Sequence, residues 1–183
     1  MKATTEHSDI LIKKAFMLAE LRNYEILREE GDDDLTNIFA QDSKGNSILF
    51  QCIFGRETIG VKRIRTLEKK IEEEGIDRVI VVGHGKYSYV ARKTALEAGI
   101  ELIPPDFPSF NIFEHELVPE HKIVPPEEAE ELLKRLRVKP FQLPHIKSDD
   151  PAVRSIGARP GDILRITRKD STAGEHTYFR YVV

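Results

Sequence analysis

Residues 61–82 read VKRIRTLEKKIEEEGIDRVIVV, and they join the two patterns that decide the fold of the first part of the chain. The apolar residues in the first half recur at helical spacing, at Val61, Ile64, Leu67 and Ile71. This spacing predicts one buried helix face, and Gly75 provides the residue that ends the helix. Residues 78–82 are too short and too β-branched for a second helix, so they predict a strand buried on both faces.

The flanking sequence extends this pattern in both directions. Before it, we expect a helix over 8–23 capped by Ser8 or Asp9, extended chain over 24–28, and a hairpin of strands 34–41 and 47–54. After it, we expect a helix over 87–98 ending at Gly99 and a strand over 100–103. The resulting order, α-β-β-β-α-β-α-β, predicts a mixed sheet with helices on it, as in restriction-endonuclease-like domains.

A second, smaller domain follows a proline-rich stretch. Residues 104–109 contain three prolines, which remove backbone donors and cannot continue a helix. We therefore place a first domain at 1–105, a linker at 106–113 and a small α+β domain at 114–183. In the last domain we expect helices over 126–137 and 151–156, and strands over 163–168 and 177–182 joined by a turn over 171–174.

Composition and charge exclude several classes of protein. Hydrophobic residues make up 40% of the chain and charged residues 32%, which indicates a globular protein. Residues 1–110 carry 16 basic and 19 acidic residues, so this part is not a basic nucleic-acid-binding domain. Residues 132–183 carry 11 basic against five acidic residues, and this net positive end suits DNA phosphates or an acidic protein.

No apolar run approaches the length of a membrane span, and the N-terminus lacks the pattern of a secretory signal. We therefore expect no membrane partner and a location inside the cell. The single cysteine, Cys52, lies in an apolar run and is expected to be a buried thiol.

A nuclease of the predicted fold needs carboxylates that hold Mg²⁺ and a nearby lysine. Such a site places an aspartate at the second strand and an acid-x-lysine on the third. Asp34 suits the first position, but residues 49–54 read LFQCIF and contain neither an acid nor a lysine. The sequence therefore predicts an incomplete metal site.

Two further motifs resemble functional sites only in part. Residues 79–86, VIVVGHGK, end in a glycine-rich turn but lack the spacing of a phosphate-binding loop. His115 and His121 are six residues apart with Pro119 between them, which does not suit zinc on one helical face. We therefore predict no catalytic residues, no metal and no cofactor.

The last third of the chain carries several motifs in one order and spacing. These are 114–121 (EHELVPEH), 142–144 (QLP), 150–154 (DPAVR), Gly157, 159–162 (RPGD), 166–168 (ITR), 172–174 (TAG) and 178–182 (YFRYV). With these motifs the sequence resembles the H subunit of archaeal RNA polymerase and the equivalent small subunit that the eukaryotic nuclear polymerases share. The resemblance covers some 70 residues. The order of elements before Pro104 looks like the N-terminal jaw domain of the eukaryotic form, which is nuclease-like and lacks catalytic residues.

The resemblance implies a component of DNA-directed RNA polymerase that is not an enzyme by itself but belongs to a nucleotidyltransferase complex. Its last domain would dock on the largest subunit within the core enzyme, and its first would help form the jaw around downstream DNA during transcription. The location would be the cytoplasm for an archaeal or viral source, with archaeal favoured, and the nucleus for a eukaryotic one. The alternatives are a metal-dependent nuclease and a free-standing transcription or repair adaptor with the same C-terminal domain.

Two sets of residues follow as expected contacts. The partner-binding set is His115, Glu116, Leu117, Val118, Pro119, Glu120, His121, Asp150, Pro151, Arg154, Gly157, Arg159, Gly161, Arg168, Thr172, Ala173, Gly174 and Arg180. The DNA-proximal set, for non-specific contacts to the DNA backbone, is Lys62, Arg63, Arg65, Lys69 and Lys70.

Overall fold

The computed structural model describes residues 2–32, 34–170 and 174–183. The chain divides into two compact units, Met1–Phe110 and Asn111–Val183, and each is described by itself. The domain boundaries and roles given above remain predictions.

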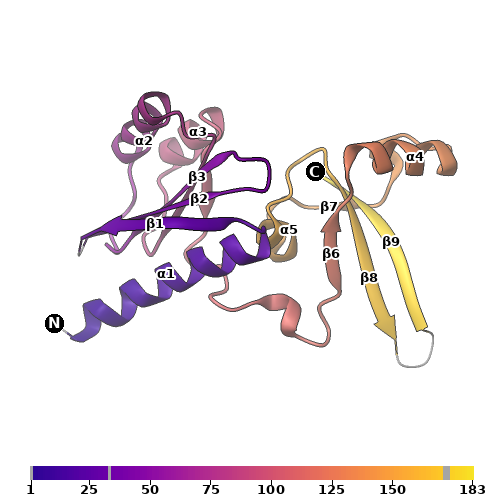
Figure 1. Cartoon of the computed structure of the whole chain (residues 1–183), viewed down its shortest axis with the longest axis horizontal. Helices are drawn as coiled ribbons and strands as arrows, with labels where there is room; N and C mark the ends of the chain where they lie inside the picture. The colour runs from indigo at the N-terminus through magenta and orange to yellow at the C-terminus, as the bar shows by residue number, and fades with distance from the viewer. Residues whose placement is uncertain (1, 33, 171–173) are drawn as a thin grey trace. The chain divides into compact units, whose positions relative to one another are not determined.

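Unit 1 is a mixed sheet between two layers of helices (Figure 1). In chain order its elements are α1 (Lys2–Leu21), β1 (Glu25–Gly31), β2 (Leu35–Gln41), β3 (Ser47–Ile53), α2 (Val61–Glu74), β4 (Arg78–Gly83), α3 (Tyr89–Glu97) and β5 (Glu101–Ile103). The strands lie side by side in the order β1-β2-β3-β4-β5. The first three pair antiparallel, whereas β4 and β5 are added in parallel. The restriction-endonuclease-like fold class predicted from the sequence is confirmed.

The central strands divide the core of unit 1 into two apolar layers. Ile48, Phe50 and Cys52 of β3 pack with α1 on one face of the sheet. Leu49 and Ile53 of the same strand pack with α2 and α3 on the other face. Because alternate residues of a strand point to opposite faces, β3 and β4 are buried on both sides, as their apolar runs predict.

Two helix boundaries differ from the sequence predictions. α1 begins at Lys2, so residues 8 and 9 lie within the helix rather than at its start. α3 begins at Tyr89 because the Ser88 side chain accepts a hydrogen bond from the Ala91 amide and serves as the N-cap. The end of α2 is as predicted, since Gly75 adopts a left-handed conformation with φ of 63°.

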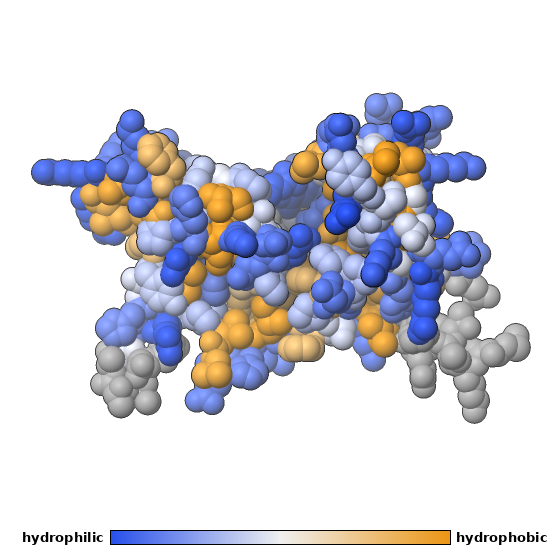
Figure 2. All heavy atoms as spheres, turned by 180° about the vertical axis from the view of Figure 1, so that it is seen from behind, coloured by the Kyte–Doolittle hydropathy of each residue, from blue (hydrophilic) through white to orange (hydrophobic). Residues whose placement is uncertain are grey.

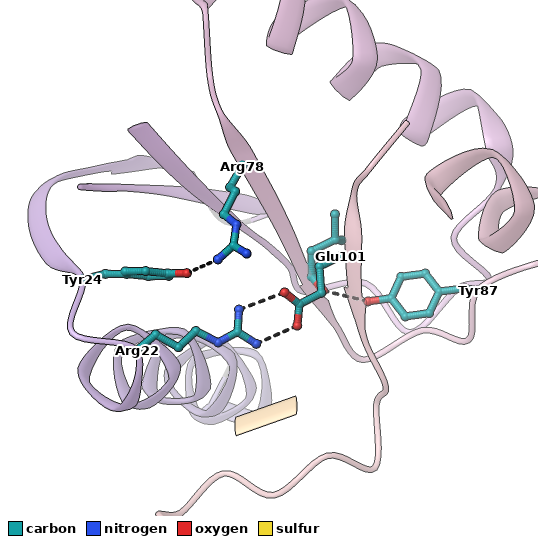
Figure 3. A network of polar contacts seen from close by, with 6 residues as sticks. Arg22, Tyr24, Arg78, Tyr87 and Glu101 are labelled. Carbon is teal, nitrogen blue, oxygen red and sulfur yellow. Dashed lines mark hydrogen bonds and ion pairs between the residues drawn. The ribbon is translucent and has the colours of Figure 1, made fainter. Parts of the chain in front are cut away.

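A polar network ties the end of α1 to the sheet (Figure 3). Arg22 donates to both carboxylate oxygens of Glu101, at 2.8 and 2.6 Å, and Arg78 donates to the Tyr24 hydroxyl. Burial opposes the charge of Arg22, but Glu101 and Tyr24 more than offset this and raise the pKa of the guanidinium. On the other side of β5, the Tyr87 hydroxyl donates to the carbonyls of Val81 and Ile103.

The glycine-rich turn after β4 lies directly against the backbone of Glu57. A Cβ added to Gly85 would lie 1.8 Å from the carbonyl oxygen of Glu57, so this position requires glycine. The turn is also fixed by a bridge between Ile59 and Tyr87. As the sequence indicates, it is a tight strand-to-helix connection.

Unit 2 is a four-stranded sheet with a helix on each face (Figure 1). Its elements are η1 (Ile112–Glu114), β6 (Glu120–Ile123), α4 (Pro126–Leu136), η2 (Pro140–Gln142), β7 (His145–Ile146), α5 (Pro151–Ile156), β8 (Ile163–Asp170) and β9 (Gly174–Val182). The strands are ordered β6-β8-β9-β7. Leu132 of α4 packs with Ile163, and Val153 of α5 packs with Leu164, the next residue of the same strand. Both predicted helices and both predicted strands are present, while β6 and β7 are too short for a sequence pattern to reveal.

Among the residues described, no helix is long and apolar enough to cross a membrane. Exposed apolar side chains nevertheless occur on both units, and Figure 2 shows them as separate orange patches among hydrophilic side chains.

Candidate functional site

A groove in unit 2 brings much of the predicted partner-binding set together. Its volume is about 710 Å³, and it is lined by residues 113–120 with Thr167 and Arg168. The antiparallel pairing of β6 with β8 places Glu120 opposite Thr167, which brings Arg168 beside the 113–120 segment. Two motifs separated by some 50 residues of sequence therefore form one surface.

Local hydrogen bonds fix the shape of the 113–121 segment. His115 Nδ1 accepts a hydrogen bond from the Leu117 amide at 3.1 Å, and His121 Nδ1 lies 2.8 Å from the Pro119 carbonyl. The His121 ring also packs on Phe113, with 5.8 Å between ring centroids. Both imidazoles thus support the backbone, while Leu117 remains 78% exposed. An exposed leucine on a fixed loop is suited to packing against another protein.

The residues of the 150–157 motif shape α5. Asp150 accepts a hydrogen bond from the Ala152 amide at 2.8 Å and caps the helix, and Pro151 occupies its first turn. Gly157 ends the helix with φ of 71°. Arg154 is half-buried in the helix and does not line the groove. This motif therefore has a structural reason for its residue types, independent of any partner.

The remaining predicted contacts among the described residues do not line the groove. The Arg159 amide donates to Asp162 at 2.7 Å, and Gly161 adopts φ of 103° in the same turn. Arg180 donates to the carbonyl of His145 at 3.3 Å, across the pairing of β9 with β7. Gly174 begins β9, whereas Thr172 and Ala173 lie outside the described residues.

Another groove, in unit 1, lies where β2, β3 and α2 approach one another. Its volume is about 860 Å³. The charged side chains that line it are Asp34, Arg56, Glu57, Lys62, Arg63 and Lys70. Of the predicted DNA-proximal set, Lys62, Arg63 and Lys70 line the groove, whereas Arg65 and Lys69 are exposed elsewhere on α2. α2 begins here at Val61, and the preceding N-cap residue, Gly60, has no side chain to cap the helix.

The unit 1 groove is also lined by a buried polar side chain, Gln51, that sequence reasoning missed. Gln51 on β3 lies directly opposite Asn37 on β2, and its Nε2 donates to Asn37 Oδ1 at 3.1 Å. Gln51 is only 6% exposed and lies on the face of β3 that carries Leu49 and Ile53. The only sign of this buried polar residue in the sequence is that a glutamine interrupts the otherwise apolar run 48–54. Asp34 lines the same groove, at the entry to the second strand where the sequence predicts it.

The fold and the groove of unit 1 define a restriction-endonuclease-like domain. Residues 5–106 match the family model described as "Restriction endonuclease". A solved structure described as "Structure of EndoMS in apo form" is similar at 20% identity with a TM-score of 0.36, over 50% of this chain and 45% of that one. This chain thus spans less than half of that protein.

Unit 2 matches a different family. Residues 110–182 match the model described as "RNA polymerase Rpb5, C-terminal domain". "DNA-directed RNA polymerase subunit Rpo5" of Thermococcus onnurineus is 60% identical over 74 residues, which are 40% of this chain and 90% of that protein. The protein of the same name from Archaeoglobus fulgidus is 55% identical over 40% of this chain and 97% of its own length.

The chain belongs to the restriction endonuclease family through its first unit and to the polymerase subunit Rpo5 family through its second. The resemblance seen in the sequence holds for residues 110–182, but the relatives are named Rpo5, so the prediction of an H subunit is corrected to Rpo5.

The endonuclease family implies a divalent metal ion, which the residues of the unit 1 groove do not suit. Across the described ranges 2–32, 34–170 and 174–183, no group of three or more histidine, cysteine, aspartate or glutamate side chains is arranged to hold a metal ion. Of the three successive residues Gln51, Cys52 and Ile53, none is an acid or a lysine.

Proposed function

We propose that the chain is a subunit of an archaeal DNA-directed RNA polymerase, attached through unit 2 and presenting unit 1 to downstream DNA. The observation that carries the proposal is the identity of 60% between unit 2 and an Rpo5 subunit that this unit covers almost completely. The archaeal sources of the relatives support an archaeal origin, for which we expect the protein in the cytoplasm.

The groove of unit 2 supports docking on another protein through shape, apolar contact and charge together. Leu117 offers exposed apolar area, and Arg168 offers a guanidinium that forms paired hydrogen bonds with carboxylates. The free edge of β6 lies beside them, since β6 pairs only with β8 in the described sheet. The largest subunit of the polymerase is the partner that we infer.

Unit 1 would contact DNA through backbone phosphates, without reading sequence. The cations Lys62, Arg63 and Lys70 line its groove, and the first two lie at the uncapped start of α2. Helix N-termini and lysine or arginine side chains are both suited to phosphate.

The test is recovery of polymerase on tagged full-length chain from its own cells. Wild type should recover the largest subunit in stoichiometric amounts. Arg168→Glu should reduce this recovery at least tenfold, because it puts a negative charge into the docking groove. Arg135→Glu, which makes the same charge change on an exposed part of α4, should not. Wild-type chain that recovers no polymerase would overturn the proposal, and recovery far below stoichiometric would favour a free-standing adaptor.

A metal-dependent nuclease is the second candidate, favoured by the match of residues 5–106 to the endonuclease family and by Asp34 in the groove. It predicts Mg²⁺-dependent cleavage of DNA by the pure chain, abolished by Asp34→Ala. Absence of cleavage at high protein concentration would exclude it.

A further inference from the structure

The Asn37–Gln51 pair is the least expected feature of unit 1. Its neighbours on the same face of β2 and β3 are Leu35, Phe39, Leu49 and Ile53, which all pack in the apolar layer under α2 and α3. Buried polar side chains are uncommon in such a layer and need hydrogen-bond partners. The two amides supply one bond to each other, at 3.1 Å.

Amides at these positions remove the need for a metal ion. Two carboxylates directly opposite each other on neighbouring strands repel unless a cation lies between them. Asparagine and glutamine are uncharged and can donate as well as accept, so the two strands can pair here without a cation. The sheet register supports this, since β2 and β3 pair without interruption from Leu35 to Gln41.

One acceptor of the pair remains available to a ligand. Among the described residues, no donor reaches Gln51 Oε1, although the atom is buried and the residue lines the groove. A buried acceptor without a donor is unfavourable by roughly 1–3 kcal/mol, which a bound hydroxyl or amino group would recover. This is an independent indication, apart from the charge of the groove, that unit 1 binds a ligand there.

The positive charge of the groove comes from side chains and a helix end. Four cations and two acids line the groove, so its net charge is positive. The cations are Arg56, Lys62, Arg63 and Lys70, and the acids are Asp34 and Glu57. Lys62 and Arg63 lie in the first turn of α2, where the helix dipole adds to their charge, and Gly60 leaves the first amides without a side-chain cap.

We propose that the groove binds the phosphate backbone of DNA without a divalent metal ion, with the Asn37–Gln51 pair in place of metal-holding carboxylates. The cations of α2 and Arg56 supply the positive charge. Gln51 Oε1 accepts a hydrogen bond from a water molecule that also donates to a phosphate oxygen, because the DNA backbone carries no donor of its own. The proposal deepens the DNA contact of the proposed function and rests on it.

The direct test is binding of a short fluorescent DNA duplex to the full chain, measured by anisotropy in EDTA and in Mg²⁺. Wild type should bind in EDTA, and Mg²⁺ should weaken binding as a competing counterion does. Lys62→Gln/Arg63→Gln should lower the slope of log affinity against log salt by about two, one for each cation. The matched control Arg92→Gln/Lys93→Gln removes the same charges from exposed positions of α3, outside the groove, and should keep the wild-type slope.

A second test introduces carboxylates at the positions of the amide pair. Asn37→Asp/Gln51→Glu would place two carboxylates directly opposite each other on β2 and β3, an oxygen-rich pair that suits Mg²⁺ or Mn²⁺. The midpoint of thermal unfolding of this variant should rise as Mg²⁺ or Mn²⁺ is added, whereas that of wild type should stay unchanged.

Three outcomes would overturn the proposal. These are DNA binding by wild type that requires Mg²⁺, equal effects of the two charge variants on the salt slope, and saturable thermal stabilisation of wild type by the metal. The groove variants should still recover polymerase from cells. Wild type that recovers polymerase but does not bind DNA in EDTA would therefore reject this inference alone, whereas failure of wild type to recover polymerase would reject the proposed function.

Discussion

The two grooves of this chain are built differently, although both are open and similar in size. The groove of unit 2 is formed by a loop whose shape is fixed by its own side chains, with Leu117 left exposed. The groove of unit 1 is lined by the buried amide of Gln51 and by a rim of cations. A fixed loop with apolar area suits a permanent protein partner, whereas a cationic rim suits a mobile polyanion.

The two units also differ in why they carry their particular residue types. In unit 2, several motif residues have local structural duties, such as Asp150 at the start of α5 and Gly157 at its end. In unit 1, the polar pair has no such duty in the apolar layer that surrounds it. The residues that point most directly to a ligand are thus those that the local fold does not require.

The largest effect that we expect concerns unit 1 alone. Arg22→Ala should lower the free energy of unfolding of unit 1 by about 3 kcal/mol, because it removes one partner of a buried ion pair. The side chain of Arg22 is 1% exposed and that of Glu101 is 32% exposed. In the variant, water can therefore hydrate the Glu101 carboxylate in part, so the loss of stability lies at the lower end of the range for buried ion pairs. Unfolding in denaturant, monitored by hydrogen exchange, would measure the stability of each unit separately.

The control for that experiment is Lys93→Ala, which removes an exposed ion pair with Glu97 on α3 and should change stability by less than about 0.5 kcal/mol. Protection of β8 and β9 should be unchanged in both variants. Equal loss of protection in the two units would show that they do not behave as separate units.

A smaller effect, also confined to unit 1, depends on pH. Burial raises the pKa of the Cys52 thiol to about 12, from 9.0. The unfolded thiol therefore releases its proton above about pH 9 while the folded one keeps it, so the stability that this thiol contributes is lost as the pH rises from 9 towards 12. At pH 10 the loss is about 1.4 kcal/mol.

This loss can be measured as the difference in unfolding free energy between pH 8 and pH 10. Cys52→Ala should show a decrease smaller than that of wild type by about 1.4 kcal/mol, since other titrating groups are common to both. Identical decreases would mean that the thiol is not buried in the folded state. Unit 2 has no cysteine and provides the internal reference.

The smallest effect tests whether a motif residue of unit 2 serves structure or partner. Asp150→Ala should destabilise unit 2 by about 1 kcal/mol through loss of the α5 cap, whereas Asp150→Asn should keep most of the stability. Asp149→Ala is the control, since it removes the same charge from the neighbouring exposed position.

Polymerase recovery then separates the two roles of Asp150. If this aspartate also binds the partner, Asp150→Asn should recover less polymerase despite its stability. Full recovery with Asp150→Asn would assign the residue to structure alone.

Much of the architecture could be predicted from the sequence because it depends on local patterns. Helical spacing at 61–71 and the β-branched run at 78–82 reflect which side chains must leave water, and this requirement acts within a few residues. Gly75 and Pro126 mark helix ends for equally local reasons, which are the left-handed conformation and the missing amide proton. The motifs of the last third indicated the polymerase family, and comparison with Rpo5 subunits bears this out.

Only the tertiary structure decided which of these residues meet. The register of β2 against β3 pairs Asn37 with Gln51, and the pairing of β6 with β8 brings Arg168 to the 113–120 loop. Strand register depends on contacts between distant segments, so no local pattern reports it. The sequence by itself determined which elements form and that the third strand lacks an acid and a lysine. The fold decided that the buried Gln51 amide and a cationic rim line one groove, because strand pairing and helix packing, rather than the order of residues, bring their side chains together.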